Sequence, residues 1–403
     1  MSKSYKIRNY DYVLLFMTIG IAVFGVFMIY SAGYYTAVLT GSQWRYVTQQ
    51  VLGLGIGVVG MILVSGIDYR LFIKPIFGKK INFVYLVYLA AIIMQVAVLF
   101  VGVEKNGAKR WLNLGFVQFQ PSEISKIAAI LFVAYAIYRS RQSLDHFAGF
   151  LRVMLFMGPS IVLILVENMS SAIIVSGIVV GMCFVGSRKK LYFAVCLVLL
   201  ICGGACYIFL GEGFRAERID IWLHVETNEN AHQIKQGLYA IATGGVFGKG
   251  LGNSMQKLGY IPEAYNDMIF AVICEELGIV GAAGLIIAFL VMFWRITWIA
   301  IKATDLFGTM ICVGVLIQLA IQVVINVAVV TNSIPSTGIP LPLISYGGTS
   351  ATIMMAEMGL VLSVSAGSKE RNGDNYACTK ETVRSGGSNR IIVGGSIFYL
   401  SYR

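Results

Sequence analysis

Ten long apolar runs constrain this chain more than any other feature of its sequence. A run of about 18 or more apolar residues can cross the hydrocarbon layer of a membrane as a helix. The fifth, sixth and tenth runs are shorter, and they could be tilted, lengthened into neighbouring residues or partly re-entrant. With 57% hydrophobic and 13% charged residues, the chain also lies outside the range of ordinary soluble domains. We therefore predict an all-α, polytopic membrane protein with about ten transmembrane helices. The ten runs are Tyr12–Tyr30, Val47–Val64, Ile81–Val103, Ile124–Tyr138, Met154–Val166, Ser171–Val185, Leu191–Leu210, Ile269–Trp294, Thr309–Val330 and Ser350–Ser365.

Basic residues distinguish the two sides of this predicted membrane protein. Roughly two thirds of the 31 Lys and Arg residues fall in one alternate set of loops and in the two termini. The positive-inside rule places these loops and both termini in the cytoplasm. The net charge of +11 follows from this bias, and no clustered basic face with interleaved aromatic residues indicates nucleic acid.

The predicted topology divides the chain into a membrane domain and a tail. Residues 1–365 form the membrane domain, and residues 211–267 form a large extracytoplasmic loop between its seventh and eighth helices. Within that loop, residues 215–222 are typical of an amphipathic interfacial helix. Residues 366–403 are rich in Ser, Gly and Asn, and we expect a cytoplasmic tail that is disordered or interaction-prone.

A glycine-rich polar stretch, Gly244–Gly252, precedes the eighth predicted helix. Its glycines would let the backbone turn sharply or pass close to a ligand. The stretch matches neither a Walker loop nor a dinucleotide-binding fingerprint. Because Lys249, Gln256 and Lys257 accompany the glycines, a diphosphate-bearing ligand is plausible, since cations match its charge.

Asp267 stands at the mouth of the eighth helix, where a carboxylate is costly to place and indicates a functional site. One interpretation is structural, because Asp is a common N-cap residue. The other is a general base at the membrane surface. The helix N-terminus would keep the carboxylate ionised, whereas partial desolvation would raise its pKa. The sequence leaves both interpretations and both effects open.

Two further carboxylates, Glu275 and Glu276, lie about two turns deeper in the same apolar run. Ionised carboxylates at that depth need partners, and we expect Lys126 or an arginine to supply one. At least one of the two should face a polar interior cleft.

The first dense polar loop is predicted outside and carries two cations, Lys109 and Arg110, against the inside bias. Both therefore suggest function, whereas Trp111 could equally be an interfacial aromatic residue. Pro121 can open the fourth helix. Glu123 then suits the positive helix end, with Lys126 one turn further on for pairing.

Two other outside turns contain candidate residues. Glu167 is the only charge between the fifth and sixth helices, and the small polar residues after it could merely cap the sixth helix. The last outside loop, residues 331–349, contains no charge and three of the seven prolines. Irregular backbone at membrane depth must be buried or line a cavity, so this loop should fold back against the helices. Asn326 in the preceding helix could hydrogen-bond to it.

These residues resemble the SEDS family (shape, elongation, division and sporulation), which includes FtsW, RodA and SpoVE, over about residues 10–365. The motifs that carry the resemblance are Lys109–Trp111 with Gln120–Glu123; Gly248–Gly252 through Pro262–Glu263 to Asp267 and Glu275–Gly278; and Thr337–Pro342 with Ser345–Gly348. Their overall character favours the FtsW and SpoVE branch. One departure concerns Glu167–Ala172, where many members carry Glu/Gln-Pro-Asp-Leu-Gly-Thr, so that an expected aspartate is missing.

The resemblance implies a multi-pass protein of the bacterial inner membrane that polymerises lipid II into glycan strands in cell division or shape maintenance. It implies a class B penicillin-binding protein as partner, alongside other division or elongation membrane proteins. The family's catalytic aspartate falls on Asp267, which would deprotonate the acceptor sugar at the extracytoplasmic face. Stabilisation of the departing diphosphate is expected from basic residues and a divalent cation, Mg or Mn. The candidate substrate-binding residues are Lys109, Arg110, Gln120, Ser122, Glu123, Lys126, Gln236, Lys249, Lys257, Glu275, Glu276, Ser345 and Tyr346.

Two other functions are compatible with the sequence. A transporter that flips lipid II would also use interior carboxylates such as Glu275, Glu276 and Glu357, but no inverted repeat is evident in the spans. A scaffold that only holds a penicillin-binding protein would leave Asp267 and the outside basic residues without a role. Polymer formation from labelled lipid II separates the three.

Overall fold

The computed structural model describes residues 10–76, 81–105, 108–113, 118–192, 195, 198, 202, 214–384, 391–393 and 396–398. Within this part of the chain, nine helices are long and apolar enough to cross a membrane. They match nine of the ten predicted runs in order, and the fold is mostly helical as predicted. The seventh run, Leu191–Leu210, falls almost entirely outside the described residues.

The regular elements include two small antiparallel sheets that the sequence did not predict. In one sheet the strands lie in the order β1–β2–β3, and this sheet falls between the third and fourth long helices in the chain. The strands β4 and β5 form the other sheet. The helices are α1 (Tyr12–Leu39), α2 (Arg45–Gly66), α3 (Phe83–Val101), α4 (Pro121–Ser140), α5 (Phe147–Glu167), α6 (Met169–Gly186), α8 (Phe214–Leu223), α9 (His232–Gly244), α10 (Ile269–Lys302), α11 (Leu306–Val330) and α12 (Gly348–Arg384). The strands are β1 (Val103–Lys105), β2 (Ala108–Asn113), β3 (Gln118–Phe119), β4 (Ile391–Val393) and β5 (Ser396–Phe398).

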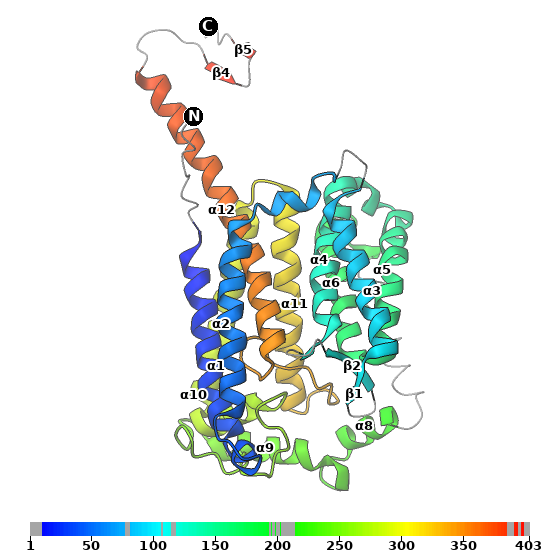
Figure 1. The fold of residues 1–403 in the computed structure, drawn as a ribbon, viewed down its shortest axis with the longest axis vertical. Coiled ribbons are helices and arrows are strands. Elements are labelled where there is room, and N and C mark those ends of the chain that lie inside the picture. Colours follow the sequence, from blue (N-terminus) through cyan, green and yellow to red (C-terminus); the bar gives the residue numbers. More distant parts are fainter. Residues whose placement is uncertain are drawn as a thin grey trace.

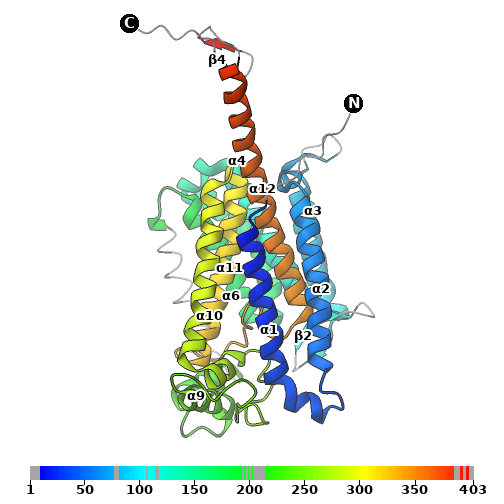
Figure 2. The same ribbon diagram turned by 90° about the vertical axis from the view of Figure 1, so that its left-hand side faces the viewer.

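The long helices stand side by side in one bundle (Figure 1). The short helices α8 and α9 lie with β1 and β2 at one end of the bundle, which we call the loop end. The opposite end, which we call the tail end, holds the start of α1 and the point where α12 leaves the bundle (Figures 1 and 2). The chain therefore enters its first long helix and leaves its last one on the same side.

The three short apolar runs are accommodated by lengthening. α5 has 21 residues, α6 has 18, and the membrane-spanning part of α12 covers Gly348–Gly367. Each helix extends beyond its apolar run, and α5 gains the most, because it begins at Phe147, seven residues before the run. α12 also passes the predicted domain boundary at residue 365 without a break, so the division into a membrane domain and a tail stays a prediction.

α10 is interrupted close to the loop end, and the glycine-rich loop fills the interruption. Gly278 has a φ of +69° inside this helix, which breaks the regular ladder of backbone hydrogen bonds. Two carbonyl groups of α10 accept hydrogen bonds from the loop, and two N–H groups of α10 donate to it. The four bonds are Lys249 N–Glu275 O at 2.9 Å, Gly250 N–Glu276 O at 2.9 Å, Ile279 N–Gly245 O at 3.0 Å and Val280 N–Val246 O at 3.1 Å.

The four hydrogen bonds between the loop and α10 explain why the loop is rich in glycine better than the close approach of a ligand does. A Cβ atom on Gly248 would lie 2.2 Å from the carbonyl oxygen of Glu276, and the φ of Gly248 is +77°. A side chain there would push the loop away from α10. The glycines therefore let two backbone segments touch where the helix lacks its own hydrogen bonds.

The uncharged loop before α12 folds back against the helices, as predicted. Leu341, Leu343 and Ile344 are buried in the hydrophobic core. Asn326 of α11 donates to the carbonyl oxygen of Ile339 at 2.8 Å, which confirms the predicted contact. Because the loop's carbonyl groups find donors inside the protein, irregular backbone is tolerated at this depth.

Replacement of Gly248 by Ala tests the contact between the glycine loop and α10. We expect G248A to lower the midpoint of thermal unfolding of the detergent-purified protein far more than G252A does. Both positions have positive φ, +77° and +83°, but a Cβ on Gly252 would meet no atom within 4 Å. G252A should therefore show only the backbone strain, about 1–3 kcal/mol, while G248A adds the clash. Equal effects of the two substitutions would contradict this account.

Candidate active site

Asp267 lies one residue before the N-cap of α10, at the loop end. The N-cap is Met268, and no side chain forms a capping hydrogen bond there. The capping interpretation of Asp267 is therefore wrong. The backbone carbonyl oxygen of Asp267 accepts a hydrogen bond from Asn326 at 2.8 Å, and a Cβ placed on Gly338 would lie 3.9 Å from its Oδ2. The side chain is half-buried and adjoins the loop that Asn326 holds in place.

Burial raises the pKa of the Asp267 carboxyl above its ordinary value, and it outweighs the opposing effects. The N–H groups of Asp267 and Met268 lower this pKa by hydrogen bonding, as does the charge of Arg218. The negative charge of Glu263 raises it further. Of the two effects that the sequence left open, desolvation therefore exceeds stabilisation by the helix N-terminus. A carboxylate with a raised pKa is a stronger proton acceptor at neutral pH.

Arg218 of α8 belongs to this site, although it is not among the site residues predicted from the sequence. Its Nη1 donates to the carbonyl oxygen of Ser336 at 3.0 Å, two residues from Gly338. Burial lowers the pKa of the Arg218 guanidinium, the charge of Arg110 lowers it further, and the charge of Asp267 raises it. Arg218 is thus affected by the charges of both Arg110 and Asp267. The signal that could have found Arg218 is the one applied to Lys109 and Arg110, a cation on the outside against the charge bias.

The segment Asn332–Gly338 connects α8 to the first turn of α6. Trp222 of α8 donates through Nε1 to the carbonyl oxygen of Asn332 at 3.0 Å. On the other side, the hydroxyl of Ser170 donates to the carbonyl oxygen of Thr337. Residues far apart in the sequence are therefore gathered around the loop that adjoins Asp267. The predicted helix at residues 215–222 is confirmed as α8.

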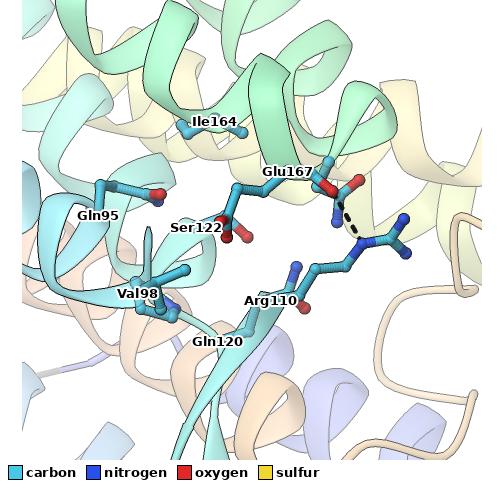
Figure 3. Close-up of a pocket in the computed structure, with 9 residues that line it drawn as sticks. Gln95, Val98, Arg110, Gln120, Ser122, Ile164 and Glu167 are labelled. Atoms are coloured by element: carbon cyan, nitrogen blue, oxygen red, sulfur yellow. Dashed lines mark hydrogen bonds between the residues drawn. The ribbon is translucent and has the colours of Figure 1, made fainter. Parts of the chain in front are cut away.

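A small polar pocket opens between the loop-end parts of α3, α4 and α5 (Figure 3). Three predicted substrate-binding residues, Arg110, Gln120 and Ser122, line it. Arg110 donates through Nε to the backbone carbonyl oxygen of Glu167 at 2.9 Å, as the dashed line in Figure 3 shows. Glu167, whose role the sequence left open, is thus part of the same pocket wall, and Asn168 caps α6 by accepting from the N–H of Ser171 at 3.1 Å.

A second polar group joins α4 to α12. Glu123 and Lys126 form the predicted pair, with Nζ and Oε1 2.7 Å apart, and Lys126 is almost fully buried. The hydroxyl of Ser350 donates to Glu123 Oε2 at 2.8 Å. Ser350 also lines a second small pocket, together with the predicted residues Ser345 and Tyr346. These four predicted site residues therefore converge from two distant parts of the chain.

The carboxylates of α10 pair with two lysines, one in the glycine-rich loop and one five residues after it. Lys249 Nζ lies 2.7 Å from Glu275 Oε1, and Lys257 Nζ lies 2.7 Å from Glu276 Oε1. The expectation that Lys126 or an arginine would supply a partner is therefore wrong, because the loop folds directly onto its own following helix. Ser31 of α1 joins the second pair, donating to Glu276 Oε1 at 2.6 Å and accepting from Lys257 Nζ at 2.8 Å.

Other predicted residues are placed away from these groups. Gln236 is half-buried on α9 and lines neither of the two pockets described above. The backbone of Lys109 lies in β2, and its side chain is outside the described part of the structure. Among the described residues, no group of three or more His, Cys, Asp or Glu side chains could hold a metal ion. The divalent cation expected from the sequence stays a prediction.

The fold and the site define a multi-pass membrane protein with one half-buried carboxyl and two guanidinium groups at the loop end of the bundle. Comparison with known proteins agrees with this class. The chain belongs to the FtsW/RodA/SpoVE family, described as "Cell cycle protein", whose model matches residues 12–370.

Relatives of similar length share about a third of their residues with this chain. The protein named probable peptidoglycan glycosyltransferase FtsW of Geobacter sp. (strain M18) is 33% identical over 371 residues, covering 89% of this chain and 98% of the relative. Stage V sporulation protein E of Bacillus subtilis (strain 168) is 34% identical over 360 residues, covering 88% and 96%.

Solved structures show the same fold. A chain from a structure described as "Structural coordination of polymerization and crosslinking by a peptidoglycan synthase complex" matches with a TM-score of 0.74 at 27% identity, covering 89% of this chain and 98% of that chain. The rod shape determining protein RodA of Thermus thermophilus matches with a TM-score of 0.64 at 26% identity, covering 88% and 96%.

The Lys257–Glu276 pair should stabilise the protein as a unit. Lys257 is 5% exposed and Glu276 is fully buried, so removing one partner leaves an uncompensated charge. We expect K257M or E276Q alone to cost about 3–5 kcal/mol of unfolding free energy, and the double variant to cost less than the sum. Thermal unfolding of the purified protein measures this, with K74M at an exposed position as the control. Additive effects in the double variant would show that the pair does not act as a unit.

Proposed function

We propose that this protein is a peptidoglycan glycosyltransferase that polymerises lipid II, with Asp267 as the general base. The half-buried Asp267 carboxyl at the loop end carries the proposal, because burial raises its pKa and the guanidinium charge of Arg218 acts on it. The names of the FtsW relatives and the structural match to a peptidoglycan synthase complex support the reaction class.

In the proposed step, the Asp267 carboxylate accepts the proton of the 4-hydroxyl of the acceptor's N-acetylglucosamine. The acceptor oxygen forms a bond to the anomeric carbon of the donor's N-acetylmuramic acid. The bond from that carbon to the diphosphate oxygen breaks with inversion, and undecaprenyl pyrophosphate leaves with the bonding electrons. Arg110 and Arg218 would stabilise the charge that develops on the diphosphate, and a divalent cation, Mg or Mn, would assist them there.

The remaining predicted site residues divide into two proposed roles. Gln120, Ser122, Glu123, Ser345 and Tyr346 would position the sugars, because each lies in or beside one of the two pockets. The lysine–glutamate pairs would instead fix the glycine loop, which leads directly to Asp267. For Lys109, Lys126 and Gln236, substrate contact stays a prediction from the sequence.

The charge bias supports the orientation that we propose for the bundle. The loop end would face the extracytoplasmic side of the bacterial inner membrane, with both termini in the cytoplasm. Lipid II would then present its sugars to Asp267 while its lipid tail stays between the helices and the bilayer. The solved synthase complex supports a class B penicillin-binding protein as partner.

Asp267→Asn tests the assignment of the base. With purified protein and labelled lipid II, with and without a penicillin-binding partner, we expect D267N to lose nearly all glycan product while its unfolding midpoint stays unchanged. Asn keeps the size of the side chain but cannot accept the proton. Wild-type polymer yield from D267N would disprove the base assignment. Translocation of lipid II without polymer by the unsubstituted protein would instead identify a flippase, and neither activity would indicate a scaffold.

The pH dependence of polymerisation offers a second test. Activity should fall as pH drops through the raised pKa of Asp267, because the protonated carboxyl cannot act as a base. The charge of Glu263 raises that pKa. E263Q should therefore lower it and move the acidic limb of the pH–rate profile to lower pH. E229Q, at an exposed position on the segment before α9, is the control, and a shift in the opposite direction or an equal shift in E229Q would contradict the account.

A further inference from the structure

The glycine-rich loop exposes large apolar side chains at the loop end of the bundle. Phe247 is 82% exposed, and Val246 and Leu251 are more than half exposed. We call these three residues the loop patch. Apolar side chains grouped in this way usually mark a surface that contacts something other than water.

The loop patch is accompanied by no unpaired charge. The two cations of residues 244–262, Lys249 and Lys257, both form ion pairs with buried carboxylates of α10. Backbone groups of the loop are also bonded to α10 at four positions across the helix break. Pairing of the lysines and these backbone hydrogen bonds lower the cost of placing the segment against hydrocarbon.

Two contacts between α1 and α10 place the loop patch at the edge of the hydrocarbon layer. At the tail end, Arg295 of α10 pairs with Asp11 of α1 at 2.8 Å, and near the loop end Glu276 of α10 contacts Ser31 of α1 at 2.6 Å. The two contacts are 20 residues apart along α1 and 19 along α10. At about 1.5 Å per residue both separations are about 30 Å, which is about the thickness of the hydrocarbon layer.

The loop patch continues the lipid-facing surface of α10. Ile279 and Val280, which follow the helix break, are both exposed, and so are Ile287 and Leu290 deeper along the helix. The N–H of Val280 donates directly to the carbonyl oxygen of Val246. The patch therefore adjoins, at the level of the membrane boundary, a surface that already faces lipid.

We propose that the loop patch is inserted into the lipid leaflet at the loop end, with Phe247 and Leu251 among the acyl chains. The glycine loop would then be a membrane anchor as well as a helix contact. It would fix the height of the Asp267 segment relative to the bilayer surface, because loop and segment are continuous and both are bonded to α10. This contact does not depend on the proposed glycosyl transfer.

Quenching by brominated lipid tests the insertion. The full-length protein is reconstituted in nanodiscs of phosphatidylglycerol and phosphatidylcholine with or without bromine on the acyl chains. Emission of the unsubstituted protein is subtracted from that of F247W and L251W. The lipid-facing control is I287W on α10, and the water-facing control is E229W in the polar segment before α9. We expect F247W and L251W to lose emission in brominated lipid to the same extent as I287W, and to resist aqueous acrylamide.

Two results would overturn the proposal. Quenching of both patch variants by acrylamide but not by brominated lipid, as expected for E229W, would place the loop in water. Protection from both quenchers would show that protein covers the patch, either this chain or a second copy. Two patch positions are used so that misfolding of one variant, detected from its unfolding midpoint, leaves the other as a test.

Discussion

The interruption of α10 is the constraint on which the loop end depends. A helix that breaks beside lipid leaves backbone groups without partners, and each such group is costly where water is absent. Here the glycine loop supplies the missing donors and acceptors. Lys249 and Lys257 neutralise Glu275 and Glu276, the two carboxylates just before the break. The loop and the helix therefore need one another. The segment that runs from the loop to Asp267 therefore begins at a position fixed by α10. The hydrogen bond from Ser31 to Glu276 connects this part of α10 to α1.

The uncharged loop between α11 and α12 fixes the site from the other side. Asn326 donates both to Asp267 and to Ile339, so that one amide joins the two segments. The stretch from Asn332 to Gly338 receives hydrogen bonds from α8 and from the first turn of α6. Arg218 is brought to Asp267 by these contacts. The half-buried carboxyl and the guanidinium group of Arg218, which acts on it, are thus positioned by contacts with the backbone of an irregular loop.

The sequence predicted those features of the structure that depend on a single segment of the chain. Apolar length predicted the membrane helices, the amphipathic pattern predicted α8, and spacing along α4 predicted the Glu123–Lys126 pair. It could not identify the partners of Glu275 and Glu276, because pairing depends on how the glycine loop folds. The break at Gly278 was hidden within a continuous apolar run. Likewise, whether burial or the helix N-terminus controls the pKa of Asp267 depends on packing that no local pattern reports.

The amide of Asn326 and the anchored glycine loop hold Asp267 from two directions. A residue whose backbone is held in this way cannot follow a lengthening product. In a polymerase built on this plan, the glycan strand itself must advance by one repeating unit after each addition, while the base stays at rest. Processivity would then depend on how the strand slides through the site, while the enzyme itself keeps the same position.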